Sequence, residues 1–270
     1  MIEPLLIIYS HNTFIDILKI TTYYLNNYKN KILLIDKDFL EDIEYNKYYK
    51  KILKYNNNVP YASRLQEINN INEDYFIIMH EVDILIKYDI NILNKFKNLM
   101  IENNYDKIEF QHCAEPHHIN KRQFELNNPE INFENICKLY KTNNVNMIKY
   151  GYALFNVNPT MWKKKSFLEI MYKFGHLGYK TIEPNLELTD FISKMNCYSL
   201  LCNSPINCGH FSCDYFFLPL HILCHGEIFN PEPMYRDYKI LINNDVLKEY
   251  NYICETFLKN SKRRKRNVFP

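Results

Sequence analysis

The sequence predicts an α/β fold in which a mostly parallel central sheet is flanked by helices. One observation is a strand–helix–strand pattern within about thirty residues, with apolar runs at 5–9 and 31–35 and helical spacing at 14–28. A second is the run at 75–79, which is apolar at every position, as strands buried on both faces of a parallel sheet are. With 270 residues, 47% of them hydrophobic, the chain can bury a sizeable core.

The other elements follow from local signals. Pro60 opens a helix with one apolar side, and a helix is expected over 91–103 and a strand over 107–110. The first ~115 residues therefore form an α/β sandwich. The C-terminal part is expected to be more irregular. Its elements are a strand at 152–157, a helix opened by Pro159 that contains Trp162 and Phe167 to Tyr172, a helix from Pro184 to about Lys194, and short strands within 197–229.

Residues 1–260 are expected to form one domain, because the sequence shows no internal repeat and no linker. Residues 261–270 form a basic tail that contains three of the six arginines of the chain. Such a tail can be a localisation signal, a phosphate-binding arm or a solubilising end. Without a groove-reading context around it, we expect a solubilising end.

Composition constrains partners and compartment. The formal net charge of +2 is too close to balance to indicate nucleic-acid or membrane binding by the folded body, apart from contacts of the basic tail. We expect no signal peptide, and no apolar stretch approaches the ~18 residues of a transmembrane segment. The eight dispersed cysteines favour free thiols in a reducing, cytoplasm-like compartment. The 36 Asn and 27 Lys, against 5 Gly, fit an A/T-rich microbe or a large virus, and for a virus the compartment is the host cytoplasm.

Glu81-Val82-Asp83 follows the most apolar strand of the chain. Ligands of open parallel sheets bind beyond the carboxyl ends of the strands. Two carboxylates there can hold one hard cation such as Mg²⁺ or Mn²⁺, which can neutralise a diphosphate. The alternative is an acidic turn that simply ends a strand.

The segment 61–83 resembles the core of GT-A type glycosyltransferases, enzymes that transfer a sugar from a nucleotide-sugar donor. In both, an amphipathic helix with an Arg-Leu step, here Arg64-Leu65, leads into a buried strand that ends in a DxD-like acidic motif. The likeness extends to the opening strand–helix–strand unit and to 152–162, about two thirds of the chain. It implies a GT-A-like (Rossmann-like) fold, with residues 1–115 as the nucleotide-binding half and 116–260 as the acceptor and sugar half.

The resemblance also implies roles for individual residues. Ser10, His11 and Asn12 would lie under a UDP- or GDP-sugar, Asp36 would face the base, and Arg64 would contact the diphosphate; a surface salt bridge is the alternative for Arg64. Asp83, supported by Glu81, would hold Mn²⁺ or Mg²⁺. The first acidic position is Glu where the family motif has Asp, which leaves the coordination geometry open.

An inverting enzyme of this kind also needs a carboxylate that accepts the proton of the acceptor hydroxyl. Glu183 precedes Pro184 at a predicted helix start, and Glu187 lies one turn later; complementing the helix dipole is the alternative role. His225 is a candidate third metal ligand, with a structural histidine as the alternative.

Other interpretations stay open. The glycosyltransferase would act on a glycan or protein acceptor, whereas a catalytically inactive relative would serve as a binding or assembly module. A nucleotidyltransferase is disfavoured because no glycine precedes residue 151, where a phosphate loop would be. The His117-His118 pair is expected to lie at the surface. Structural zinc is an alternative to buried thiols for the group Cys197, Cys202, Cys208, His210 and Cys213, which lacks the C-x2-C step.

Overall fold

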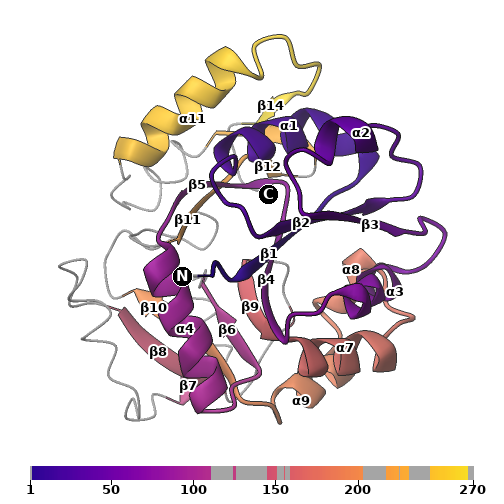
Figure 1. The fold of residues 1–270 in the computed structure, drawn as a ribbon, viewed down its shortest axis with the longest axis vertical. Coiled ribbons are helices and arrows are strands. Elements are labelled where there is room, and N and C mark those ends of the chain that lie inside the picture. The colour runs from indigo at the N-terminus through magenta and orange to yellow at the C-terminus, as the bar shows by residue number, and fades with distance from the viewer. Residues whose placement is uncertain are drawn as a thin grey trace.

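The computed structural model describes residues 2–110, 124–125, 145–150, 155, 159–202, 217–224, 226–230 and 244–266. Within these ranges a nine-stranded sheet forms the centre of the molecule, in the order β3-β2-β1-β4-β9-β6-β10-β8-β7 (Figure 1). Its strands are β1 (Leu5–Tyr9), β2 (Lys31–Asp36), β3 (Lys51–Tyr55), β4 (Tyr75–His80), β6 (Lys107–Glu109), β7 (Phe124–Glu125), β8 (Val145–Tyr150), β9 (Thr160–Lys163) and β10 (Cys197–Cys202).

The sheet is mostly parallel, which confirms the expected fold class. Strands β3, β2, β1 and β4 are parallel neighbours. Strand β9 is antiparallel to both β4 and β6, so β6 again runs parallel to β4. Strand β10 is parallel to β6, whereas β8 and β7 alternate in direction beyond it.

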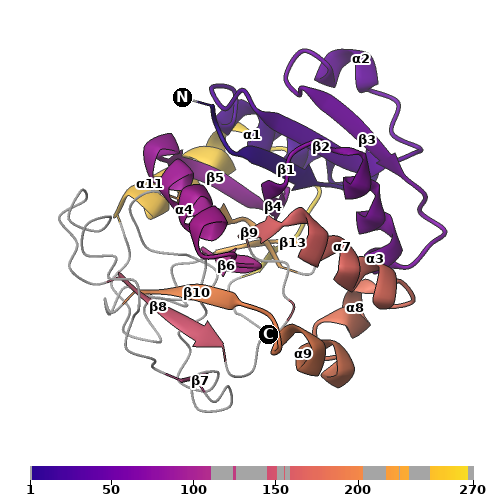
Figure 2. The ribbon, with the colours of Figure 1, turned by 60° about the horizontal axis from the view of Figure 1, so that its bottom comes forward.

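Helices cover both faces of this sheet because its strands are apolar on both sides. Leu6 and Ile8 of β1 pack with residues of α1 and α4, whereas Leu5 and Ile7 pack with residues of η2 and α7. Figures 1 and 2 show these two layers. The described helices are η1 (Asn12–Phe14), α1 (Ile15–Tyr24), α2 (Asp42–Tyr45), α3 (Tyr61–Arg64), η2 (Leu65–Asn70), α4 (Ile90–Glu102), α7 (Lys164–Lys173), α8 (Tyr179–Ile182), α9 (Leu186–Ile192) and α11 (Asn244–Thr256).

Two small sheets extend the fold beyond β4. Strand β5 (Asp83–Tyr88) pairs antiparallel with β11 (Phe217–His221). Strands β12 (Leu223–Cys224), β13 (Glu227–Phe229) and β14 (Lys265–Arg266) form the other. A third apolar cluster joins both sheets to α1 and α11. Thus Asp83 begins a strand, β5, that the sequence did not predict.

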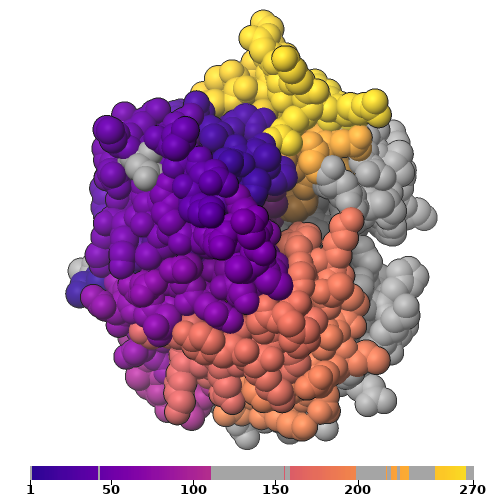
Figure 3. Space-filling view, turned by 90° about the vertical axis from the view of Figure 1, so that its right-hand side faces the viewer, coloured from indigo at the N-terminus to yellow at the C-terminus, as the bar shows by residue number. Residues whose placement is uncertain are grey.

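The beginning of the basic segment is part of the folded body. Strand β14 pairs with β13, and Arg263 forms two hydrogen bonds to the carboxylate of Asp16, at 2.7 and 2.8 Å. The guanidinium of Arg263 also donates to the carbonyl oxygen atoms of Thr13 and Gly226 and lies over the ring of Phe14. Figure 3 shows C-terminal residues in yellow against the indigo N-terminal part. The segment 261–266 is therefore attached to the folded body through Arg263 and β14, unlike the expected free end, although Lys262, Arg264 and Lys265 are exposed.

Two local expectations are wrong. Trp162, expected in a helix, lies in β9 between β4 and β6, and the helix begins only at Lys164. This stretch is fully buried at Thr160, Met161 and Trp162, so pairing on both sides outweighs the helix signal of Pro159.

The helix expected from Pro184 is also corrected. Residues 179–192 form two short helices, and α9 begins after Asn185, whose side-chain oxygen accepts from the backbone N–H of Leu188 at 2.8 Å. Glu183 therefore caps the end of α8 and does not begin a helix.

Some expected features lie outside the described residues. They include most of the strand at 152–157, His117-His118, His225 and the cysteines beyond Cys202 of the zinc group. Cys197 and Cys254 carry free thiols. Within the described ranges, no helix is both long enough and apolar enough to span a bilayer.

Candidate nucleotide and metal site

The candidate site lies at the carboxyl edge of β1 and β4. The chain proceeds from β1 to β2 and β3 on one side of the sheet and then places β4 on the other side of β1. This reversal is a topological switch point, where open α/β sheets bind ligands beyond the strand ends. Ser10 follows β1, Asp36 ends β2 and Glu81 follows β4, so the fold brings these three predicted residues to one edge.

Asp36 connects the first two strand ends. Its Oδ2 atom accepts from the backbone N–H of Asn12 at 2.6 Å, and its Oδ1 atom accepts from that of Asp38 at 3.1 Å. The residue is fully buried. Asp36 therefore fixes the loop after β1 through Oδ2 and the turn after β2 through Oδ1, whereas the resemblance implied contact with a base.

The loop after β1 holds the other two predicted residues. Ser10 is fully buried and its backbone N–H donates to the carbonyl oxygen of Leu34 at 2.9 Å. The Nδ1 atom of His11 accepts from the backbone N–H of Thr13 and so caps η1. The imidazole of His11 therefore serves as the N-terminal cap of the helical segment η1.

An aromatic cluster lines the same edge. The ring of Tyr9 stacks on that of Tyr55, with centroids 5.2 Å apart and planes at 6°. The guanidinium of Arg64 lies over Tyr55 and donates to the carbonyl oxygen atoms of Asn57 and Val59. Arg64 thus orders residues 57–59, and its predicted contact with a diphosphate remains a prediction.

A second group of rings continues the cluster toward α8. The hydroxyl of Tyr61 forms a 2.8 Å hydrogen bond with Nε2 of His80, and Tyr179 packs edge-on against Tyr61. Burial lowers the pKa of His80 to about 4, so this imidazole is neutral near pH 7. Burial, followed by the charge of the exposed Glu183 carboxylate four residues further on, raises the pKa of Tyr179. Glu183 therefore lies beside this aromatic edge.

Glu81 is the most perturbed carboxyl group of the site. It is 3% exposed, and its Oε2 atom has no hydrogen-bond partner among the described residues. Burial, followed by the nearby charge of Asp83, raises its pKa to about 8, while Arg263 opposes the shift. A buried acceptor without a donor is unusual in a folded protein and indicates a missing proton or cation.

Asp83 has a specific partner that the sequence did not suggest. Its Oδ1 atom lies 2.8 Å from Nδ1 of His221, which sits directly opposite in the β5–β11 ladder. Both side chains are largely buried. His221 lies four residues before His225, which the sequence suggested as a third metal ligand. No local sequence pattern distinguishes these two histidines.

Glu187 does not join the site. It lies in the first turn of α9 with its side chain 73% exposed, and its carboxylate is 3.9 Å from the ammonium of Lys173. No group of three or more His, Cys, Asp or Glu side chains in the described ranges is arranged to hold a metal ion. Glu81 and Asp83 alone offer two oxygen donors, and the unpartnered Oε2 atom of Glu81 fits a hard cation.

Similarity between this chain and known proteins is found by comparison of structures and not by comparison of sequences. No protein-family model matches the sequence, and no curated protein matches it. Among solved structures, apo UDP-glucose pyrophosphorylase is 8% identical with a TM-score of 0.47, over 93% of this chain and 98% of that one. The glycosyltransferase GlyE of Streptococcus pneumoniae TIGR4 is 9% identical with a TM-score of 0.45, over 93% of this chain and 64% of that one. S. aureus TarS 1–349 is 9% identical with a TM-score of 0.44, over 95% and 73%.

At these identities and TM-scores the comparisons assign no function to this chain. The assignment of a function therefore depends on the strand ends, the two carboxylates and the aromatic edge described above.

Proposed function

We propose that this protein is a metal-dependent glycosyltransferase that transfers a sugar from a UDP- or GDP-sugar to a glycan or protein acceptor. The observation that carries the proposal is the pair Glu81 and Asp83 at the switch point, with a buried carboxylate oxygen that lacks a partner. A diphosphate brings negative charge, so carboxylates at its site require a cation. The resemblance of segment 61–83 to GT-A enzymes supports the same interpretation.

Different residues would bind the metal ion and position the nucleotide. Glu81 and Asp83 would hold Mn²⁺ or Mg²⁺, which when bound neutralises the donor diphosphate. His221 orients Asp83 through their hydrogen bond. The loop Ser10–Asn12, fixed by Asp36, would lie under the nucleotide.

Glu183 is the proposed base for the acceptor hydroxyl. It is exposed at the end of α8, beside Tyr61 and Tyr179, where an acceptor has access. Its carboxylate would take the proton as the acceptor oxygen bonds to the anomeric carbon of the donor and the bond from that carbon to the nucleoside diphosphate breaks. Glu187 lies 3.9 Å from the ammonium of Lys173 and is retained only as an alternative base.

Nucleotide binding tests the proposal. We expect Mn²⁺-dependent binding of UDP or GDP to the wild type, measured by calorimetry, and a loss of at least about tenfold in affinity for Asp83→Ala. Asp190→Ala is the matched control because that carboxylate is exposed on α9 and pairs with Lys194. Hydrolysis of a panel of nucleotide sugars would identify the donor.

Two results would overturn the proposal. One is a wild type that binds no nucleotide in the presence of Mn²⁺. The other is an Asp83→Ala variant that binds as well as the Asp190→Ala control. Nucleotide binding without sugar transfer or donor hydrolysis would favour the inactive binding module.

A further inference from the structure

Two apolar side chains project into solvent from the region of α2. Leu40, just before α2, is 91% exposed, and Ile43, within α2, is 93% exposed. Among the described residues, no other large apolar side chain is exposed to this extent. Single exposed apolar residues are ordinary on a protein surface, whereas neighbouring ones form a patch that marks an interaction site. Leu40 and Ile43 together form such a patch, an apolar ridge.

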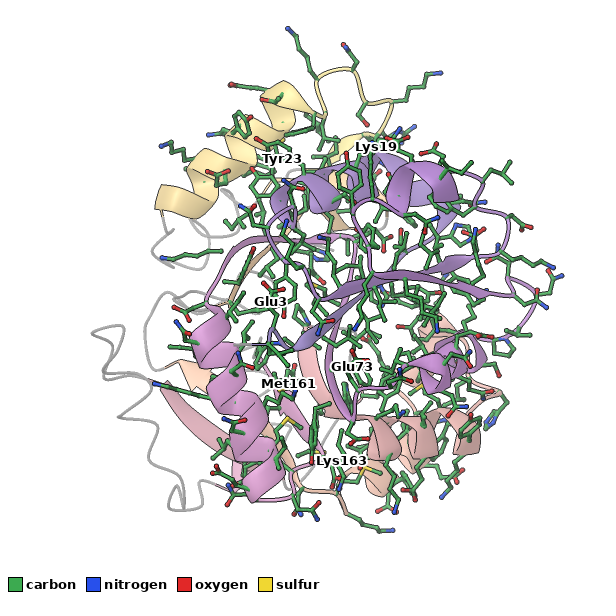
Figure 4. All side chains as sticks on the ribbon, in the orientation of Figure 1. Glu3, Lys19, Tyr23, Glu73, Met161 and Lys163 are labelled. Carbon is green, nitrogen blue, oxygen red and sulfur yellow. The ribbon has the colours of Figure 1, made fainter. Side chains whose placement is uncertain are left out.

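A hollow with aromatic walls lies next to the ridge. Its volume is about 400 Å³, and the residues that line it include Lys19, Tyr23, Glu44, Tyr48 and Phe257. The rings of Tyr23 and Phe257 are 5.2 Å apart, and Tyr23 is 55% exposed, so this wall is open to solvent. Figure 4 labels Lys19 and Tyr23, which lie on α1 next to α11. Because Glu44 directly follows Ile43, the ridge borders the hollow.

Opposite charges lie at the two ends of this face. At the end that carries the ridge, the stretch 38–46 contains four acidic residues and neither Lys nor Arg, although Lys19 of α1 lies 3.9 Å from Glu41. At the other end, the stretch 257–266 contains six basic residues and no acidic one. Four of the six are exposed in the described chain, namely Lys259, Lys262, Arg264 and Lys265. The face is therefore acidic at one end and basic at the other, with an apolar centre.

We propose that this face joins two copies of the chain in a symmetric homodimer. Around a two-fold axis, the ridge of each copy enters the hollow of the other, and the acidic end of each copy contacts the basic end of the other. Because every contact is made twice, the assembly closes at two copies. Apolar and aromatic side chains then form the centre of the interface, whereas the charged residues form its rim and fix the orientation of the two copies.

A second copy accounts for all three features of the face. A bilayer of anionic lipids attracts the basic end but repels the acidic end, where the ridge lies. A small ligand in the hollow leaves the ridge uncovered. The inference goes beyond the proposed transfer reaction, because the ridge and the hollow share no residue with the candidate nucleotide and metal site.

Sedimentation velocity of the full chain measures the oligomeric state directly. Between about 1 and 100 μM, we expect an equilibrium of monomer and dimer with a dissociation constant in the micromolar range. Ile43→Ser should weaken the dimer at least about tenfold, because an apolar side chain is lost from the centre of the interface. Leu186→Ser, at a 73% exposed leucine of α9, is the matched control and should dimerise as the wild type does. Both side chains are mostly exposed in the monomer, so neither change should lower its melting temperature.

Charge reversal tests the orientation of the two copies. Glu44→Lys changes the acidic end, and Lys259→Glu combined with Lys262→Glu changes the basic end; all three side chains are exposed. Each variant alone brings like charges together across the interface and should dimerise at least about tenfold more weakly than the wild type. An equimolar mixture of the two variants should recover a dimer, because each changed end then contacts an opposite charge.

The outcomes separate this proposal from the proposed reaction. Asp83→Ala should dimerise as the wild type does, even if it fails to bind nucleotide. The dimer is overturned if the wild type is monomeric throughout the concentration range, if Ile43→Ser dimerises as well as Leu186→Ser, or if the mixture of charge variants stays monomeric. A monomeric chain that instead binds vesicles containing phosphatidylserine would assign the basic end to a membrane surface and would also overturn the dimer.

Discussion

The carboxyl group of Glu81 makes the stability of this protein depend on pH. Its pKa is raised to about 8 by burial, above the value of the unfolded chain, so stability is greatest when the group is protonated and is lost as the pH rises toward 8. His80, whose pKa is lowered to about 4, acts in the opposite sense between about pH 6.5 and 4. Between pH 6.5 and 8 the ionisation of Glu81 dominates, because the ammonium of Lys31, whose pKa burial lowers to about 8, opposes it only near the upper end of this interval.

We predict that urea unfolding of the metal-free protein shows a loss of about 1–2 kcal/mol in the free energy of unfolding between pH 6.5 and 8. Glu81→Gln should remove most of this dependence because glutamine does not ionise. An equally steep loss in Glu81→Gln would show that another group is responsible.

The same protonation links metal binding to pH. A metal ion must displace the proton of Glu81, so Mn²⁺ should bind more tightly at pH 8 than at pH 6.5 and should release protons. Calorimetry in two buffers of different ionisation enthalpy measures this release. Proton release that is unchanged in Glu81→Gln would contradict the assignment.

His221 provides a third test at the residue scale. Its Nδ1 atom is 2.8 Å from Asp83, so His221→Ala should weaken Mn²⁺-dependent nucleotide binding about tenfold by releasing that carboxylate. His221→Asn retains a polar group and should recover part of the affinity. Unchanged binding in His221→Ala would mean that Asp83 needs no partner.

At the scale of elements, the sequence predicts what local pattern determines. The apolar runs of β1, β2 and β4 and the helical spacing of α1 identify the sheet and the switch point. Contacts between segments that are distant in the sequence determine the other elements. Strand β9 forms because neighbouring strands pair with the stretch around Trp162 on both sides, and β5 forms because it pairs with β11. The aromatic edge has no sequence signal, because nothing in the sequence distinguishes Tyr9, Tyr55 and Tyr61 from the other tyrosines among the 23 of the chain.

Strand β9 should therefore be critical for stability. Trp162 is 1% exposed and contacts the rings of Phe155 and Phe167. Trp162→Ala is expected to lower the free energy of unfolding by about 3–5 kcal/mol through loss of buried area and creation of a cavity. Trp162→Phe should recover part of this loss in the same urea titration. A loss below about 1 kcal/mol would be inconsistent with a central position in the sheet.

At the scale of the whole molecule, Arg263 joins the two ends of the chain. It binds Asp16, 247 residues earlier, and contacts Thr13 and Phe14 of η1, the short helix between β1 and α1. It also opposes the raised pKa of Glu81, so its charge reaches the candidate site. The C-terminal segment can thus influence the site although its sequence is typical of a solvated end.

Arg263→Ala should lower the free energy of unfolding by about 1–2 kcal/mol, a value reduced for the partial exposure of Asp16. It should also raise the pKa of Glu81 further, because a nearby positive charge is removed, and so weaken Mn²⁺ binding at pH 7. Arg264→Ala is the matched control: that side chain is exposed, and its loss should change stability by less than about 0.5 kcal/mol. Identical behaviour of the two variants in unfolding and in Mn²⁺ titrations would contradict this prediction. It would mean that the basic segment contributes only net charge and that the contact between Arg263 and Asp16 does not couple this segment to the candidate site.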